Sequence, residues 1–126
     1  NKQVSILLEN IDHLKIIADS NLIKLLLFNL IRNSSHYNEH KHVEVKIMGD
    51  PSMPTHLLVS DNGSGIDKSL WRKVFYDFYR IQKSTGQNVR GSGLGLSMCK
   101  RIMGLHQGKI RIIKSASTGT TFEIIF

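Results

Sequence analysis

Two asparagines lie four residues apart in an apolar stretch. Asn29 and Asn33 fall near the leucine-rich stripe of a predicted helix, with His36 and Tyr37 one turn further on, because residues four apart share a helix face. An amide buried without a partner costs about 1 to 3 kcal/mol, so these side chains need an internal hydrogen bond or a polar ligand. The spacing predicts either that Asn33 holds a neighbouring loop in place by hydrogen bonds or that these side chains form a ligand site.

A carboxylate followed by two glycines forms the second candidate. Asp61 ends a predicted strand, and Asn-Gly-Ser-Gly leads on to Ile66. Gly63 and Gly65 permit positive φ and let another group approach the backbone closely, while Asp61 offers an acceptor. Ordinary turn chemistry is the alternative interpretation.

The third candidate is a glycine-rich stretch that opens into a helix, with glycines at Gly91, Gly93 and Gly95. Free N–H groups and the dipole at a helix N-terminus favour anions such as phosphate. The stretch lacks the Gly-Lys-Ser/Thr of a Walker loop, and its glycine spacing differs from that of dinucleotide sites. It indicates a different phosphate site, or a hinge that binds nothing.

Two helices and six strands are predicted to position these residues. Helical spacing predicts a long, mostly buried helix over 21–37 and a second from 93 to 104 or 106. Strand-like patterns occupy 4–8, 14–18, 43–48, 56–60, 109–114 and 120–126.

The segment between the helices is less regular. Residues 67–79 have a helix-like start and carry most of the aromatic residues, and 80–92 is a polar, basic loop. The order of elements predicts an α+β two-layer sandwich, with a mixed, mainly antiparallel sheet covered on one face by helices.

Composition limits the class of protein. The 126 residues suffice for one domain, and 17 Lys and Arg against 10 Asp and Glu favour an anionic partner. The single cysteine, Cys99, excludes an internal disulfide and fits a reducing compartment. No apolar run reaches the roughly 20 residues of a membrane span, and we expect a soluble piece of a longer protein.

Four segments, in order, resemble the N, G1, F and G2 boxes of the catalytic ATP-binding domain of sensor histidine kinases. They are residues 29–37, 61–65, 75–79 and 91–96. The same superfamily includes gyrase and the mismatch-repair ATPases. The resemblance implies a Bergerat-type ATP-binding fold, one domain over residues 1–126, and ATP and Mg²⁺ as ligands.

The resemblance also implies roles for single residues. Asn33 would ligate a Mg²⁺ that bridges the ATP phosphates, a task for which its amide oxygen is suited. Asp61 would accept a hydrogen bond from the adenine 6-amino group, supported by a hydroxyl or a water at Thr120 or Thr121, and Tyr37 would pack on the nucleotide. The other expected nucleotide contacts are Asn29, His36, Gly63, Gly65, Ile66, Phe78, Gly91, Gly93, Leu94, Gly95 and Leu96.

Residues 80–90 would form the lid over the nucleotide. Arg80, Lys83 and Arg90 are the candidates for contact with the γ-phosphate, from their charge and position.

Two positions depart from the family pattern. His36 stands where a Lys or Arg is common, which weakens the expectation of a phosphate contact there. Asn29 stands where the hydrolysing relatives carry a Glu as general base, and an amide cannot accept a proton. The resemblance therefore implies slow ATP hydrolysis.

The expected partner is the dimerisation and histidine phosphotransfer domain of the same protein, since no histidine here has the context of a phosphate acceptor. A response regulator or receiver domain would follow indirectly. We expect no nucleic acid partner, and a cytoplasmic location as part of a sensor kinase.

Four alternatives are weaker. They are a partner-docking or nucleotide-sensing module of the same fold, nucleic-acid binding through the basic surface, a metal cluster of His36, His40 and His42, and an aromatic stacking platform over 75–79.

Overall fold

The computed structural model describes residues 2–81 and 94–126. Its elements are β1 (Gln3–Glu9), α1 (Ser20–His36), β2 (His42–Asp50), β3 (Met53–Asp61), the short 3-10 helices η1 (Lys68–Leu70) and η2 (Lys73–Phe75), α2 (Gly95–Leu105), β4 (Lys109–Ala116) and β5 (Gly119–Ile125).

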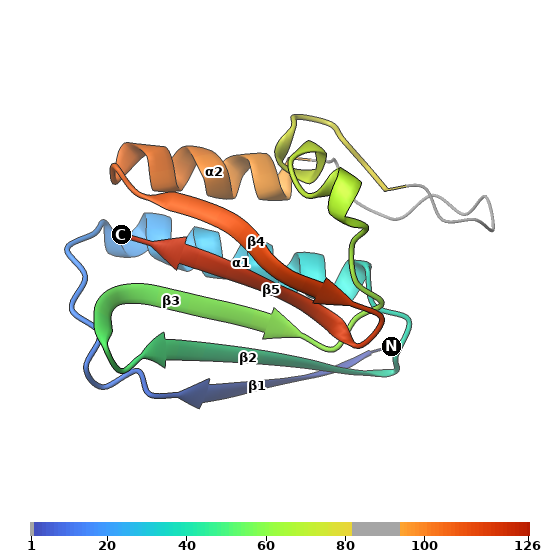
Figure 1. Ribbon diagram of the computed structural model, residues 1–126, viewed down its shortest axis with the longest axis horizontal. Coiled ribbons are helices and arrows are strands. Elements are labelled where there is room, and N and C mark those ends of the chain that lie inside the picture. Colours follow the sequence, from blue (N-terminus) through green and yellow to red (C-terminus); the bar gives the residue numbers. More distant parts are fainter. Residues whose placement is uncertain (1, 82–93) are drawn as a thin grey trace.

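The five strands form one sheet in the order β1-β2-β3-β5-β4. β1 pairs parallel with β2, because α1 carries the chain back between them, and the other neighbours are antiparallel. Both helices cover the same face of the sheet (Figure 1). The predicted fold class, a two-layer sandwich with a mixed, mainly antiparallel sheet, is confirmed.

The core lies between the sheet and the helices. Alternate residues of β2, β3 and β5 point into it, as the period of a strand requires. From α1 the buried stripe is Leu26, Leu30 and Ser34, at the i, i+4, i+8 spacing of one helix face. The stripe turns the neighbouring positions of α1, which include Asn29 and Asn33, toward the side that faces α2.

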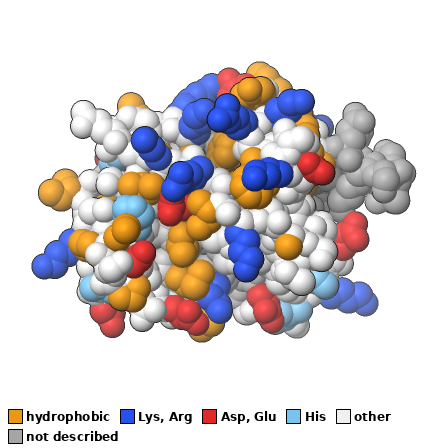
Figure 2. All heavy atoms as spheres, viewed as in Figure 1, with side chains coloured by type: hydrophobic (Ala, Val, Ile, Leu, Met, Phe, Trp, Pro, Cys, Tyr) orange, Lys and Arg blue, Asp and Glu red, His pale blue; other side chains and the backbone are white. Residues whose placement is uncertain are grey.

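Positive charge is concentrated in the second half of the chain. Residues 62–126 hold eleven Lys and Arg against three Asp and Glu, whereas residues 1–61 hold six against seven. In Figure 2, Lys and Arg side chains are most frequent over the upper part of the molecule, where β4 and α2 lie. The imbalance favours an anionic ligand or partner on that side.

The strand expected at 14–18 is absent. This segment makes two isolated backbone bonds, from Leu14 N to Ile11 O and from Lys15 N to Pro54 O, while it crosses from the sheet to the start of α1. Leu14 and Ile16 are half-buried, and Lys15 and Ile17 are exposed. The alternation that predicted a strand reflects one-sided packing without a hydrogen-bonded neighbour.

Two further expectations need correction. α1 is less buried than predicted, because Leu25 and Phe28 project outside the buried stripe and are exposed. Residues 67–79 form η1 and η2 instead of an α-helix, and Asp67 caps the first of them by accepting from Ser69 N.

None of the helices within the described residues is long and apolar enough to cross a membrane.

The rotation of α1 can be tested with two alanine variants. Leu30 is 0% exposed and Phe28 is 59% exposed. Leu30→Ala should lower the free energy of unfolding by about 2 to 5 kcal/mol, and Phe28→Ala by less than about 0.5 kcal/mol. Urea unfolding measures both, and equal losses would show that α1 is rotated differently.

Candidate functional site

A cavity of about 200 Å³ opens between α1, α2 and the segment that precedes the undescribed residues. α1 and its C-cap contribute Leu25, Asn29, Arg32, Asn33, His36 and Tyr37. The other lining residues are Ile66, Val74, Tyr79, Ile81, Leu94, Gly95, Leu96 and Met98. The cavity thus has an apolar floor and a polar wall along α1, the composition typical of small-molecule sites.

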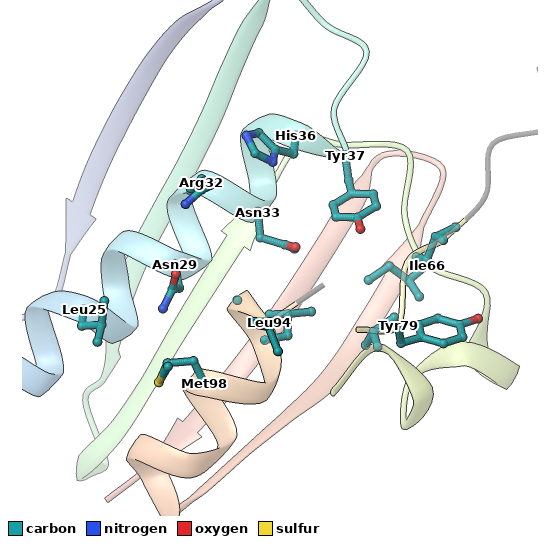
Figure 3. A pocket seen from close by; sticks show the side chains of 14 residues that line it. Leu25, Asn29, Arg32, Asn33, His36, Tyr37, Ile66, Tyr79, Leu94 and Met98 are labelled. Atoms are coloured by element: carbon teal, nitrogen blue, oxygen red, sulfur yellow. The ribbon is translucent and has the colours of Figure 1, made fainter. Parts of the chain in front are cut away.

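The two asparagines face the start of α2. Figure 3 shows Asn29 and Asn33 on the side of α1 that faces Leu94 and Met98. A Cβ added to Gly95 would lie 3.8 Å from Asn29 Oδ1, so the first residue of α2 and this amide are neighbours. Two side-chain amides and the N-terminal N–H groups of a helix therefore line the same space, which suits phosphate oxygens and a cation bound to them.

Tyr37 closes the same space from the C-cap of α1. Burial raises the pKa of its phenol, although a backbone bond with Ile81 and the charge of Arg80 oppose the change. The phenol consequently stays protonated at neutral pH and presents a ring face and an O–H donor.

Asp61 sits at the end of β3, just outside the residues that line the cavity. Its Oδ1 accepts from Gly63 N at 2.9 Å and from Thr120 N at 3.2 Å, and its Oδ2 lies 3.2 Å from the hydroxyl of Ser34. Burial raises the pKa of this carboxyl, and the three hydrogen bonds only partly oppose the shift. The carboxyl of Asp61 is therefore a half-buried acceptor whose orientation is fixed by these three hydrogen bonds.

Glycine is required at two positions around Asp61. Gly65 has φ +85°, and a side chain there would overlap the carbonyl oxygen of Ala116. Gly119 has φ +142°, and a Cβ would overlap the carbonyl oxygen of Asp61 itself. The turn after β3 and the turn before β5 therefore approach each other through glycines.

Some predicted site residues lie elsewhere. Thr120 contacts Asp61 through its backbone amide, while its hydroxyl bonds with Ser115. The hydroxyl of Thr121 bonds with Ser60, and alternation along β5 puts Thr121 on the sheet face away from the helices.

Phe78 is 71% exposed, with φ +63°, and does not line the cavity; its neighbour Tyr79 does. Arg80 is exposed and also lies outside the lining. The predicted contacts of Lys83, Arg90, Gly91 and Gly93 fall outside the described residues.

The proposed histidine cluster has no support from these contacts. His42 Nε2 lies 2.9 Å from Ser5 Oγ, and no group of three or more His, Cys, Asp or Glu residues in the described ranges could hold a metal ion.

Sequence reasoning missed several residues of the site. Met98 and Ile81 line the cavity, and Ser34 and Gly119 adjoin Asp61. The i+4 spacing from Leu30 to Ser34 was a usable signal, because it placed a hydroxyl on the buried stripe. The contact of Gly119 with Asp61 had no local signal.

The fold and this site define an ATPase-type domain. Residues 18–126 match the family described as histidine kinase-, DNA gyrase B-, and HSP90-like ATPase, and the chain belongs to this family.

Three similar proteins are a sensor protein and two histidine kinases. The chain is 34% identical over 116 residues to the sensor protein CiaH of Streptococcus pneumoniae, an alignment that covers 92% of this chain and 26% of CiaH. It is 28% identical to the catalytic domain of the histidine kinase ThkA, with a TM-score of 0.72 over 96% of this chain and 78% of that one. A mycobacterial sensor histidine kinase, MprB, shares the fold with a TM-score of 0.74 at 24% identity, over 98% of this chain and 82% of that one. The chain thus spans about a quarter of the length of CiaH.

The burial of Asp61 predicts a stability effect with a definite sign. Folding raises the pKa of Asp61 above its ordinary 3.8, so this carboxyl stabilises the fold fully below that value, and the contribution is lost as pH rises through the folded-state pKa. Asp61→Asn keeps an acceptor for Gly63 and Thr120 without the buried charge. It should raise the Tm at pH 7, by an amount that shrinks on acidification.

Asp67→Asn is the control, because a bond from Ser69 lowers the pKa of that exposed carboxyl. Its effect at pH 7 should be small and of opposite sign. A lower Tm for Asp61→Asn at pH 7 would contradict the assignment.

Proposed function

We propose that this chain is the catalytic domain of a sensor histidine kinase, which binds Mg-ATP and donates the γ-phosphoryl group to a histidine on a separate helical domain. The observation that carries the proposal is the meeting of Asn29, Asn33 and the N-terminus of α2 at one cavity. Membership of the ATPase family supports ATP as the nucleotide.

The residues present suit a bound Mg²⁺. Asn33 lines the cavity with an amide, whose oxygen is a ligand that Mg²⁺ accepts alongside phosphate oxygens and water. Mg²⁺ held there would neutralise charge on the phosphates. Asn33 would fix the cation, Asn29 would bind the phosphate chain beside it, and Gly95 would offer a backbone N–H.

The base would extend from the phosphates toward Asp61. Ile66 and Tyr37 supply apolar surface along the way, and Asp61 would accept from the exocyclic amino group. Arg80, Lys83 and Arg90 would approach the γ-phosphate from the lid segment 80–90, and the positive charge of this half of the chain favours the polyphosphate.

The site favours transfer over hydrolysis. A water attacking the γ-phosphate needs a base, and Asn29, which lines the cavity where the hydrolysing relatives would carry a Glu, offers only an amide. Catalysis by positioning and charge stabilisation then suffices, as is usual for phosphoryl transfer.

The acceptor histidine would lie on the dimerisation and phosphotransfer domain of the parent protein. Several histidines of this chain have internal contacts: His13 with Asp50 O, His42 with Ser5, and His106 with both Ile102 O and Asp19 N. A response regulator or receiver domain would take the phosphoryl group next, in the cytoplasm.

Removal of Asn33 tests the proposal. Asn33→Ala should weaken binding of a non-hydrolysable ATP analogue in the presence of Mg²⁺ by about 10 to 100-fold, the range seen when the surroundings of a metal site are altered, and much less in EDTA. Calorimetric titration measures both affinities.

Asn21→Ala is the matched control, because Asn21 is an exposed asparagine in the first turn of α1. It should bind like the wild type. Equal affinity of Asn33→Ala and wild type with Mg²⁺ would overturn the metal assignment, and a wild-type chain that binds no nucleotide would favour the partner-docking alternative.

A further inference from the structure

Ser34 is a polar residue on the buried stripe of α1. It is 4% exposed, and it follows Leu26 and Leu30 at the positions that pack on the sheet. Its Oγ lies 2.9 Å from the carbonyl oxygen of Leu30 and 3.2 Å from Asp61 Oδ2. The hydroxyl has a single proton, so it can serve only one of these acceptors at a time.

The carbonyl of Leu30 does not depend on this proton. Within α1 it already accepts from the backbone N–H of Ser34, as helix geometry requires. The hydroxyl is therefore available to Asp61 without leaving a buried acceptor unsatisfied.

The two oxygens of Asp61 are used differently. Oδ1 is occupied by the N–H groups of Gly63 and Thr120, whereas among the described residues Oδ2 has Ser34 as its hydrogen-bond partner. A carboxylate oxygen accepts two hydrogen bonds, so Oδ2 keeps one free acceptor position.

We propose that Ser34 is a positioning residue for base recognition, whose hydroxyl donates to Asp61 Oδ2, orients this carboxylate toward the nucleotide and so makes the site select adenine over guanine. The inference rests on the proposed nucleotide function. It assigns the selectivity to the pair Ser34 and Asp61 rather than to Asp61 alone.

The chemistry of the two bases gives the selectivity. Adenine carries an amino donor at position 6, which matches an ionised Oδ2, and guanine carries an oxygen there, which an ionised carboxylate repels. A protonated Asp61 reverses the preference, since its O–H can donate to guanine O6. When Asp61 holds the proton it can also donate to Ser34 Oγ, while Ser34 donates to Leu30.

Among the described residues, the groups that contact Asp61 are neutral. α1 presents Ser34, the turn after β3 presents Gly63, and β5 presents Thr120; no charged group in residues 2–81 and 94–126 contributes to the shift in the pKa of Asp61. Loss of the Ser34 hydroxyl therefore removes one of the few contacts that favour the ionised form.

The test is the affinity of Ser34→Ala for non-hydrolysable ATP and GTP analogues as a function of pH. At pH 7.5 the ratio of ATP to GTP affinity should fall about tenfold relative to wild type, the effect of one lost hydrogen bond to a charged group. The pH below which ATP binding weakens should also move upward, because Asp61 takes up a proton more readily.

Ser97→Ala is the matched control. Ser97 is also 4% exposed and donates to the Leu94 carbonyl at 3.0 Å, with no contact to Asp61. The same hydroxyl deletion there should leave the affinity ratio and the pH midpoint at their wild-type values. Should Ser34→Ala not fold, Ser34→Cys keeps the shape of the side chain, slightly enlarged, with a weaker donor, and should change both quantities in the same direction.

An unchanged ratio and midpoint in a folded Ser34 variant would overturn the inference while leaving nucleotide binding intact. A wild-type chain that binds neither analogue would overturn the proposed function, and this inference with it.

Discussion

The buried carboxylate of Asp61 ties together parts of the chain that are far apart in sequence. It accepts from the turn that follows β3, from the start of β5 and from a hydroxyl on α1. Because a carboxylate in such a place loses hydration, these donors must be present, and they fix how the sheet, the turn and α1 meet. Gly119, against the backbone of Asp61, keeps that junction close.

α1 transmits this constraint to the cavity. Its stripe of Leu26, Leu30 and Ser34 fixes the rotation of the helix against the sheet, and the rotation places Asn29 and Asn33 opposite the start of α2. In the proposed function, the contacts to the phosphates and the contact to the base would lie on neighbouring faces of this helix. This order of parts would suit one elongated ligand with a charged end and an aromatic end.

The sequence sufficed for whatever depends on local periodicity. The two helices, the β2–β3 and β4–β5 hairpins and the i+4 asparagines were all predictable. Features that depend on contacts between residues far apart in sequence were not predictable. Residues 14–18 alternate like a strand but have no pairing partner, and only the register of β5 against β3 shows that Thr120, not Thr121, faces Asp61. Ser34 meets a partner 27 residues away, which no local pattern specifies.

The most direct test of this account is an NMR titration of the isotope-labelled chain with a non-hydrolysable ATP analogue and Mg²⁺. The account predicts saturable shifts of the amide signals of Asn33, Gly63 and Gly95, with the signals of β1, at the far edge of the sheet, unmoved. Shifts that fail to saturate, or that centre on β1, would contradict the claim that this cavity binds the nucleotide.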